Sequence, residues 1–193
     1  MPLNIAFIPY IQSLALNGFQ VFCIFIHMID FKDIENLKKK GFTGFRTVKE
    51  LWANRKYIPK EMGVYCVINS DRNQPQFINP GVCGTHKGKD QNVSTETLEE
   101  DYINDTQIIY IGKAGGSDVD ATLHSRVGKY LSCGKNNTCS HSGGRYIWQL
   151  KNHEDLIFCW KTISEDEPRN LEIKMLRKFS EQFGSLPFAN LSY

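Results

Sequence analysis

The stretch QIIYIGKAGG, residues 107–116, joins a short apolar run to a glycine-rich turn. An apolar, β-branched run that ends at glycine predicts a strand over 108–112. The sequence GVYCVI at 63–68 predicts a second strand of the same kind. Because side chains alternate between the two faces of a strand, pairing of these segments would place Tyr65 and Tyr110 on one face. We therefore expect a sheet built around this pair, with two phenols side by side.

The remaining segments predict an α+β fold. Helices are expected at 31–40 before Gly41, after the capping box Thr47–Glu50, at 95–102, at 123–131, and from Pro168 to about Phe183 before Gly184. Further strands are predicted at 145–150 and 156–163. This order predicts helices packed around a small, mostly antiparallel sheet, as in an α/β sandwich. The expected domain covers 63–193 with an insertion at 69–106, and residues 1–62 form a short N-terminal helical extension.

Length and charge limit the function classes only broadly. The chain of 193 residues suffices for one well-packed domain with extensions. A net charge of +2 means that any nucleic-acid-binding surface must be local. The apolar run at 21–29 is too short to span a bilayer, and no positive segment precedes it as in a signal peptide. We expect no membrane association, and we hypothesise that natural translation starts at Met28, so that residues 1–27 are not native.

The six cysteines bear on redox state and on metal binding. Cys66 and Cys159 lie in apolar strand-like runs, where a free thiol behaves as a small hydrophobic side chain. This favours a reduced, cytoplasmic protein. The spacing Cys-x5-Cys-x-His is not a standard zinc spacing, so metal binding stays open for a set of candidate ligands. These candidates are Cys83, His86, Cys133, Cys139 and His141.

A carboxylate on the last predicted helix falls on its apolar face. At 100° per residue, Glu172 lies within the apolar stripe, which is formed by Leu171, Met175, Phe179, Phe183 and Leu176. An inward carboxylate requires a metal ion or a cationic pocket, because burial of an unpaired charge is costly. The alternative is that Glu172, which is near the helix start, reaches water or the N-terminal dipole.

Two side chains of the predicted 123–131 helix indicate a phosphate site. Arg126 and Tyr130 are four residues apart and lie together beside the apolar face. The loop at 113–116 has little side-chain bulk, so its backbone amides and Lys113 can approach a phosphate. Its spacing matches neither a P-loop nor a dinucleotide-binding glycine motif. The alternative is an arginine whose aliphatic stem packs on the tyrosine.

Several short motifs follow one another along the chain: GVY at 63–65, YIG at 110–112, Arg126, Glu172, and Asn190 within PFAN. In this order they resemble the GIY-YIG nuclease superfamily, over about residues 63 to 190. Lys113 after YIG, and Tyr130 four residues after Arg126, resemble the incision subunit of bacterial nucleotide excision repair. Some restriction endonucleases share this domain. The chain departs from compact members in its long insertion and in a stretched interval between Glu172 and Asn190.

The resemblance implies hydrolysis of DNA phosphodiester bonds with one divalent metal, Mg²⁺ or Mn²⁺. It places Glu172 on the metal and Arg126 on the scissile phosphate, which suits a planar guanidinium. A tyrosine would act as, or position, the general base for the attacking water. A free phenol has a pKa of ~10, so we expect the nearby Lys113 to favour the phenolate. The expected catalytic set is Tyr65, Tyr110, Lys113, Arg126, Tyr130 as an orienting residue, and Glu172.

DNA is the expected partner, with a homodimer if the protein acts as a restriction enzyme. No separate DNA-binding motif is visible, so the insertion and the 132–151 loop are expected to contact DNA. One alternative is a non-catalytic or structure-selective DNA-binding module, and another is a nuclease acting on RNA. The expected substrate-binding residues are Lys87, Lys89, Lys135, His141, Arg145 and Asn190.

Overall fold

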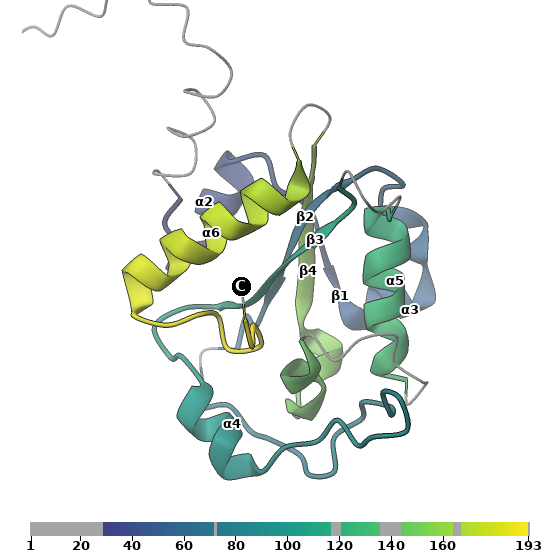
Figure 1. Ribbon diagram of the computed structural model, residues 1–193, viewed down its shortest axis with the longest axis vertical. Helices are drawn as coiled ribbons and strands as arrows, with labels where there is room; N and C mark the ends of the chain where they lie inside the picture. The colour runs from purple at the N-terminus through teal and green to yellow at the C-terminus, as the bar shows by residue number, and fades with distance from the viewer. Residues whose placement is uncertain (1–28, 72, 117–120, 136–143, 164–166, 193) are drawn as a thin grey trace, which may run out of the picture.

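The computed structural model describes residues 29–71, 73–116, 121–135, 144–163 and 167–192 (Figure 1). Its centre is a four-stranded sheet in the order β1-β4-β2-β3, in which all neighbouring strands are antiparallel. The α+β class, the antiparallel sheet and the pairing of the first two predicted strands are therefore confirmed. The strands are β1 (Thr43–Thr47), β2 (Gly63–Ile68), β3 (Ile108–Ala114) and β4 (Ile157–Thr162).

Helices cover both faces of the sheet (Figure 1). On one face lie α2 (Ile34–Lys39) and α6 (Pro168–Phe183), and on the other lie α3 (Val48–Ala53) and α5 (Leu123–Cys133). A further helix, α4 (Thr95–Asp101), belongs to the insertion between β2 and β3. The central strand β2 is buried along its whole length, because each of its faces is covered by a helical layer.

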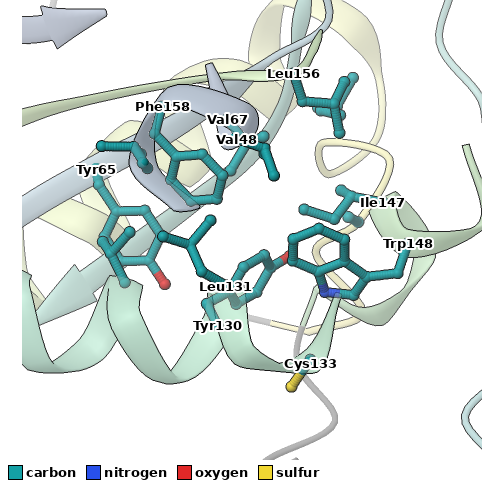
Figure 2. Close-up of a cluster of buried hydrophobic side chains, with 14 of the residues drawn as sticks. Val48, Tyr65, Val67, Tyr130, Leu131, Cys133, Ile147, Trp148, Leu156 and Phe158 are labelled. Carbon is teal, nitrogen blue, oxygen red and sulfur yellow. The ribbon is translucent and has the colours of Figure 1, made fainter. Parts of the chain in front are cut away.

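The alternation of side chains along β2 divides the interior into two cores. Val64 and Cys66 face α2 and α6, whereas Tyr65 faces α3 and α5. Figure 2 shows the core on the α5 side, where Tyr130 contacts both Tyr65 and Trp148. Aromatic side chains bury about 150–250 Å² each, so this cluster supplies much of the hydrophobic stabilisation on that side.

Local sequence signals determine where two of the helices begin and end. The Thr47 side chain accepts a hydrogen bond from the N–H of Glu50, and the Glu50 side chain accepts one from the N–H of Thr47. This capping box opens α3 as predicted. Helix α6 begins at Pro168 and ends at Gly184, which has a φ of 78°. Both predicted ends of that helix are confirmed.

The prediction of a strand at 145–150 is wrong. Residues Arg145–Gln149 form a short 3₁₀ helix, η2, which follows a turn where Gly144 has a φ of 71°. The N–H of Ile147 donates to the carbonyl of Gly144, and the N–H of Leu150 donates to that of Ile147. Leu150 then makes an isolated bridge to Phe77. A buried apolar run this short is compatible with either a strand or a helix, and its period cannot decide between them.

The sequence does not predict strand β1. Its residues include Gly44 with a φ of 93° and Phe45 with a φ of 45°, so the strand carries an irregularity and lacks alternation. The ring of Trp160 in β4 occupies the space beside Gly44, where a Cβ would lie 2.5 Å from a ring atom. Residues 43–47 therefore belong to the sheet, and the segment before β2 is packed together with the rest of the protein.

Two expectations from composition can be compared with the structure. Among the described residues, no helix is long and apolar enough to cross a bilayer. Cys66, Cys83 and Cys159 are buried and form no disulfide, but Cys133 is disulfide-bonded. The prediction of a reduced chain is therefore wrong for Cys133, because the argument from apolar strands does not apply to a cysteine at a helix end. The hypothesis about Met28 concerns residues outside the described ones.

Candidate functional site

The predicted catalytic residues meet at the edge of the sheet, along β3. Helix α5 packs on one face of this strand and α6 on the other (Figure 1). Tyr110 lies within β3, Arg126 in the first turns of α5, and Glu172 in the second turn of α6. The charge of Arg126 acts on both Tyr110 and Glu172. The edge thus brings together groups from three distant parts of the sequence.

The two phenols share a face, as predicted. The ring centroids of Tyr65 and Tyr110 are 5.9 Å apart. Gly112 lies directly opposite Tyr65 in the register of β2 and β3, and a Cβ there would be 2.7 Å from atoms of both rings. Glycine is therefore required at this position for the phenols to lie against β3. The sequence analysis missed this role, although a glycine inside a strand is a signal of close approach.

Both phenols are neutral at neutral pH. Burial raises the pKa of Tyr65 well above its ordinary value, and burial also raises the pKa of Tyr110. The charge of Arg126 lowers both pKa values, and a hydrogen bond with Tyr65 lowers that of Tyr110, but burial outweighs these effects. A neutral phenol can orient a water molecule by hydrogen bonding, but removal of a proton from that water requires a stronger base.

Lys113 lies on the side of β3 away from the phenols. It is paired with Val64, whose side chain belongs to the core beneath α2 and α6. Its Nζ donates to the carbonyl oxygen of Gly115 at 3.2 Å, and its charge lowers the pKa of Glu172. Alternation along the strand therefore directs Lys113 toward α6, and the cation that acts on the phenols is Arg126.

Glu172 points inward, as predicted. Its side chain is 14% exposed, compared with 50% for Arg169, whose Nη1 lies at a long 3.8 Å from Glu172 Oε2. Burial raises the pKa of Glu172, although the charges of Lys113, Arg169 and Arg126 lower it. In the described part of the chain, no three His, Cys, Asp or Glu side chains form a metal-binding group. A half-buried carboxylate with one long ion pair fits a divalent cation that takes its other oxygen ligands from water and phosphate.

The inward position of Glu172 leads to a prediction about stability and pH. Because the pKa of Glu172 is raised in the folded state, the protonated carboxyl stabilises the fold relative to the ionised one. This contribution to the free energy of unfolding is fully present below the ordinary pKa of glutamate and is lost as pH rises through the raised pKa. Glu172→Gln resembles the protonated acid, so we expect a higher melting temperature than wild type at about pH 8, and no difference at about pH 4. Glu181→Gln, at an exposed position of the same helix, is the control and should show no such gain. A lower melting temperature for Glu172→Gln at the higher pH would contradict the argument.

Tyr130 supports the site from the core. Its side chain is buried, its hydroxyl donates to the carbonyl of Gly144, and burial raises its pKa. Its ring lies on that of Tyr110, with centroids 5.4 Å apart and an interplanar angle of 29°. Tyr130 therefore packs against Tyr110 from the core and uses its hydroxyl inside the protein, and the orienting role expected for it stays a prediction.

Asn190 closes the free edge of β3. Its side-chain amide donates to the carbonyl of Ile111 at 2.8 Å, and its Oδ1 accepts from the N–H of Ile111 at 2.9 Å. The N–H of Ala189 donates to the carbonyl of Ile109 at 2.8 Å. The segment after α6 thus pairs with β3 as a short extra strand would. Both polar groups of the Asn190 side chain form hydrogen bonds within the protein, so Asn190 stabilises the edge of the sheet beside the predicted catalytic residues.

Loss of this amide should destabilise the edge. We expect Asn190→Ala to lower the free energy of unfolding by about 2 kcal/mol, because two main-chain groups of Ile111 lose their partners. Chemical denaturation measures the change. Leu191→Ala, at the exposed neighbouring residue, is the control and should stay within about 0.5 kcal/mol of wild type. Equal free energies of unfolding for the two variants would contradict the argument, because they would show that water satisfies the main-chain groups of Ile111 as well as the amide does.

The other predicted DNA contacts are distributed over the rest of the molecule. Lys87 and Lys89 lie on a turn of the insertion. Lys135 lies two residues after the end of α5, a helix about 16 Å long. Arg145 is the first residue of η2. His141 lies outside the described residues. Gly144, which precedes Arg145, accepts the hydrogen bond of Tyr130, so Arg145 lies near the phenols, whereas Lys135 lies beyond the far end of α5.

The candidate cysteine and histidine ligands do not assemble within the described residues. The N–H of Gly84, next to Cys83, donates to the carbonyl of Cys133 at 3.1 Å, so these segments are neighbours. Cys133 is disulfide-bonded and is therefore not a thiolate ligand. No group of three ligands is present in this part of the chain. Cys139 and His141 lie outside it.

Comparison of the chain with family models, curated proteins and solved structures gives no match in any of the three. The functional interpretation therefore depends on the site itself. The geometry on which it rests is the meeting of a guanidinium, a half-buried carboxylate and two phenols at one strand edge.

Proposed function

We propose that the protein is a metal-dependent endonuclease of the GIY-YIG type, which hydrolyses phosphodiester bonds in DNA. The observation that supports this most is the convergence of Arg126, Glu172 and two phenols at the edge of β3. Among the described residues Arg126 forms no ion pair, and the single ion pair of Glu172 is long. A guanidinium and a carboxylate with these surroundings suit a phosphate and a divalent cation that approach from solvent.

Each side chain has a role in this reaction. Arg126 binds phosphate oxygens through its planar fork and stabilises the charge that develops on them. Glu172 is the protein ligand of Mg²⁺ or Mn²⁺, which when bound stabilises the leaving oxygen. Tyr65 and Tyr110 hydrogen-bond the attacking water and direct its oxygen toward phosphorus. A bond forms between the water oxygen and phosphorus, and the bond to the leaving oxygen breaks. The proton that the water loses passes to solvent and the leaving oxygen takes up a proton from solvent, so that one water is consumed.

A second candidate function is favoured by the protonation state of the phenols. Because Tyr65 and Tyr110 are neutral, the residues of the site lack a strong base at neutral pH. A DNA-binding module with the same fold, either non-catalytic or selective for a DNA structure, would need none. The two functions differ in whether bound DNA is cut.

The test is incubation of the purified full chain with supercoiled plasmid and Mg²⁺, with EDTA as the control. Discrete, metal-dependent fragments support a sequence-specific nuclease, and nicked circles alone support incision of the repair type. Intact plasmid that is still bound by the protein supports the DNA-binding module. Intact and unbound plasmid contradicts both, and cleavage of RNA by the same preparation would then reassign the substrate.

The proposal includes a partner and a location. DNA is the partner. If the protein cuts both strands at one site, as a restriction enzyme does, it acts as a homodimer. A DNA substrate and the buried, reduced thiols of Cys66, Cys83 and Cys159 agree with the cytoplasm. The disulfide of Cys133 is unusual for that compartment. Analytical ultracentrifugation with DNA tests the dimer.

A further inference from the structure

We propose that Arg55, Lys60 and His124 bind the phosphate backbone of DNA beside the cleavage site. These three residues are called the basic cluster below. They connect the segment before β2 with the start of α5. The inference rests on the proposed nuclease function and adds a substrate-binding surface from a segment to which the sequence motifs assign no role.

Arg55 is held firmly against α5. Its Nη2 donates to the carbonyl oxygen of His124 at 3.2 Å. It also lies directly over Gly128, where a Cβ would be only 1.7 Å from Nη2. The N–H of His124 in turn donates to the carbonyl oxygen of Pro59 at 2.8 Å. The segment 55–60 is therefore fixed along the first turns of α5, and a glycine within the helix makes room for the guanidinium.

The members of the basic cluster have no acidic partner among the described residues. Ion pairs are formed there by Lys38, Arg46, Arg169 and Lys178, each with a glutamate three or four residues away. No member of the basic cluster forms an ion pair with a carboxylate in this part of the chain, a property that it shares with exposed cations such as Lys39 and Arg177. Arg55 and Lys60 place two positive charges close to His124, and an anion bound between these groups would compensate them.

The electrostatics of His124 show how close the members are. Burial lowers the pKa of His124, and the charges of Arg55 and Lys60 lower it further. The positive end of the α5 dipole lies at the same place, because His124 is in the first turn. An anion between these groups removes the repulsion and favours the protonated imidazole. A phosphate of the DNA backbone supplies such an anion.

The basic cluster and Arg126 flank the same end of α5. His124 and Arg126 are two positions apart and therefore point about 200° away from each other around the helix. A helix with its side chains is about 10–12 Å wide, and each strand of a DNA duplex carries one phosphate for about every 3.4 Å of the duplex axis. A duplex whose scissile phosphate lies on Arg126 therefore has further phosphates close enough to contact the basic cluster.

The test measures binding of a short DNA duplex by fluorescence anisotropy at several salt concentrations, in EDTA so that the duplex stays intact. The double variant Arg55→Ala/Lys60→Ala is compared with Lys39→Ala/Arg177→Ala, which removes the same charge from exposed positions of α2 and α6. Loss of two phosphate contacts should make the slope of log Kd against log salt shallower by about 1.8, and weaken binding roughly 10- to 60-fold at about 0.1 M salt. The control should keep the wild-type slope.

A single variant and a kinetic measurement separate binding from folding. Lys60→Ala removes a side chain with no hydrogen bond or ion pair among the described residues, and should make the slope shallower by about 0.9. The double variant should cleave at the wild-type rate at saturating DNA, with a raised KM, because Arg126 and Glu172 are unchanged.

The outcomes distinguish this inference from the proposed function. A wild-type protein that binds and cuts DNA, together with a double variant that binds like the control, would overturn the basic cluster alone. A wild-type protein that neither binds nor cuts DNA would overturn the nuclease proposal and the basic cluster with it. A double variant with the shallower slope and an unchanged rate supports both.

Discussion

Arg126→Ala is expected to lower the rate of plasmid cleavage about 100- to 1000-fold at saturating DNA, which is the usual effect of removing one preorganised donor to a developing charge. Arg126 also lowers the pKa values of Tyr65, Tyr110 and Glu172. Its removal therefore raises all three pKa values further. The phenols become still weaker bases, and the carboxylate binds a proton more tightly in competition with a metal ion.

Two other arginine variants make this result specific. Arg177→Ala removes an exposed arginine of α6 and should cleave at the wild-type rate. Arg126→Lys keeps the charge and loses the planar fork, so it should fall between wild type and Arg126→Ala. Melting temperatures of all three show whether the fold is retained. If folded Arg126→Ala cleaves like wild type, Arg126 does not contact the scissile phosphate and the proposed site is wrong.

Gly63→Ala is expected to lower the free energy of unfolding by about 3 kcal/mol, which is a large part of the total of about 5–15 kcal/mol for a domain. A Cβ at residue 63 would lie 2.1 Å from the main-chain oxygen of Lys161 in β4. No side-chain rotation relieves a contact with a backbone atom. Strand β2 would have to move away from β4, and the hydrogen bonds of the ladder near Thr162 would lengthen. Such a shift also moves Tyr65 in the same strand.

Gly88→Ala is the matched control for Gly63→Ala. Gly88 has a φ of 73° and nothing within 4 Å of the added Cβ, so alanine there costs only the backbone strain of about 1 kcal/mol. Urea unfolding followed by tryptophan fluorescence compares the two. If both variants lose the same stability, the close approach of β4 to Gly63 is not what requires glycine in the GVY motif.

The sequence by itself determines the features that depend on a local period. Alternation within 63–68 and within 108–112 shows which residues of each strand share a face, because successive side chains of a strand point to opposite sides. It predicts that Tyr65 and Tyr110 can share a face if the strands pair, and the observed register brings them together. The period of α6 likewise places Glu172 among apolar residues, and the structure finds it 14% exposed. The capping box of α3 needs only residues 47 and 50. These predictions hold because their physical causes lie within a few residues.

Only the tertiary structure decided the features that depend on distant segments. Strand β1 joins the sheet by pairing with β4, which is far away in the sequence. Residues 145–149 form a 3₁₀ helix, which the short apolar run alone could not distinguish from a strand. The pKa values of the phenols are raised by burial, which sums over every element packed around them. Asn190 reaches Ile111 across 79 residues, and Arg55 reaches His124 across 69. A local sequence pattern cannot predict such contacts, because they join residues that become neighbours only when the whole chain has folded.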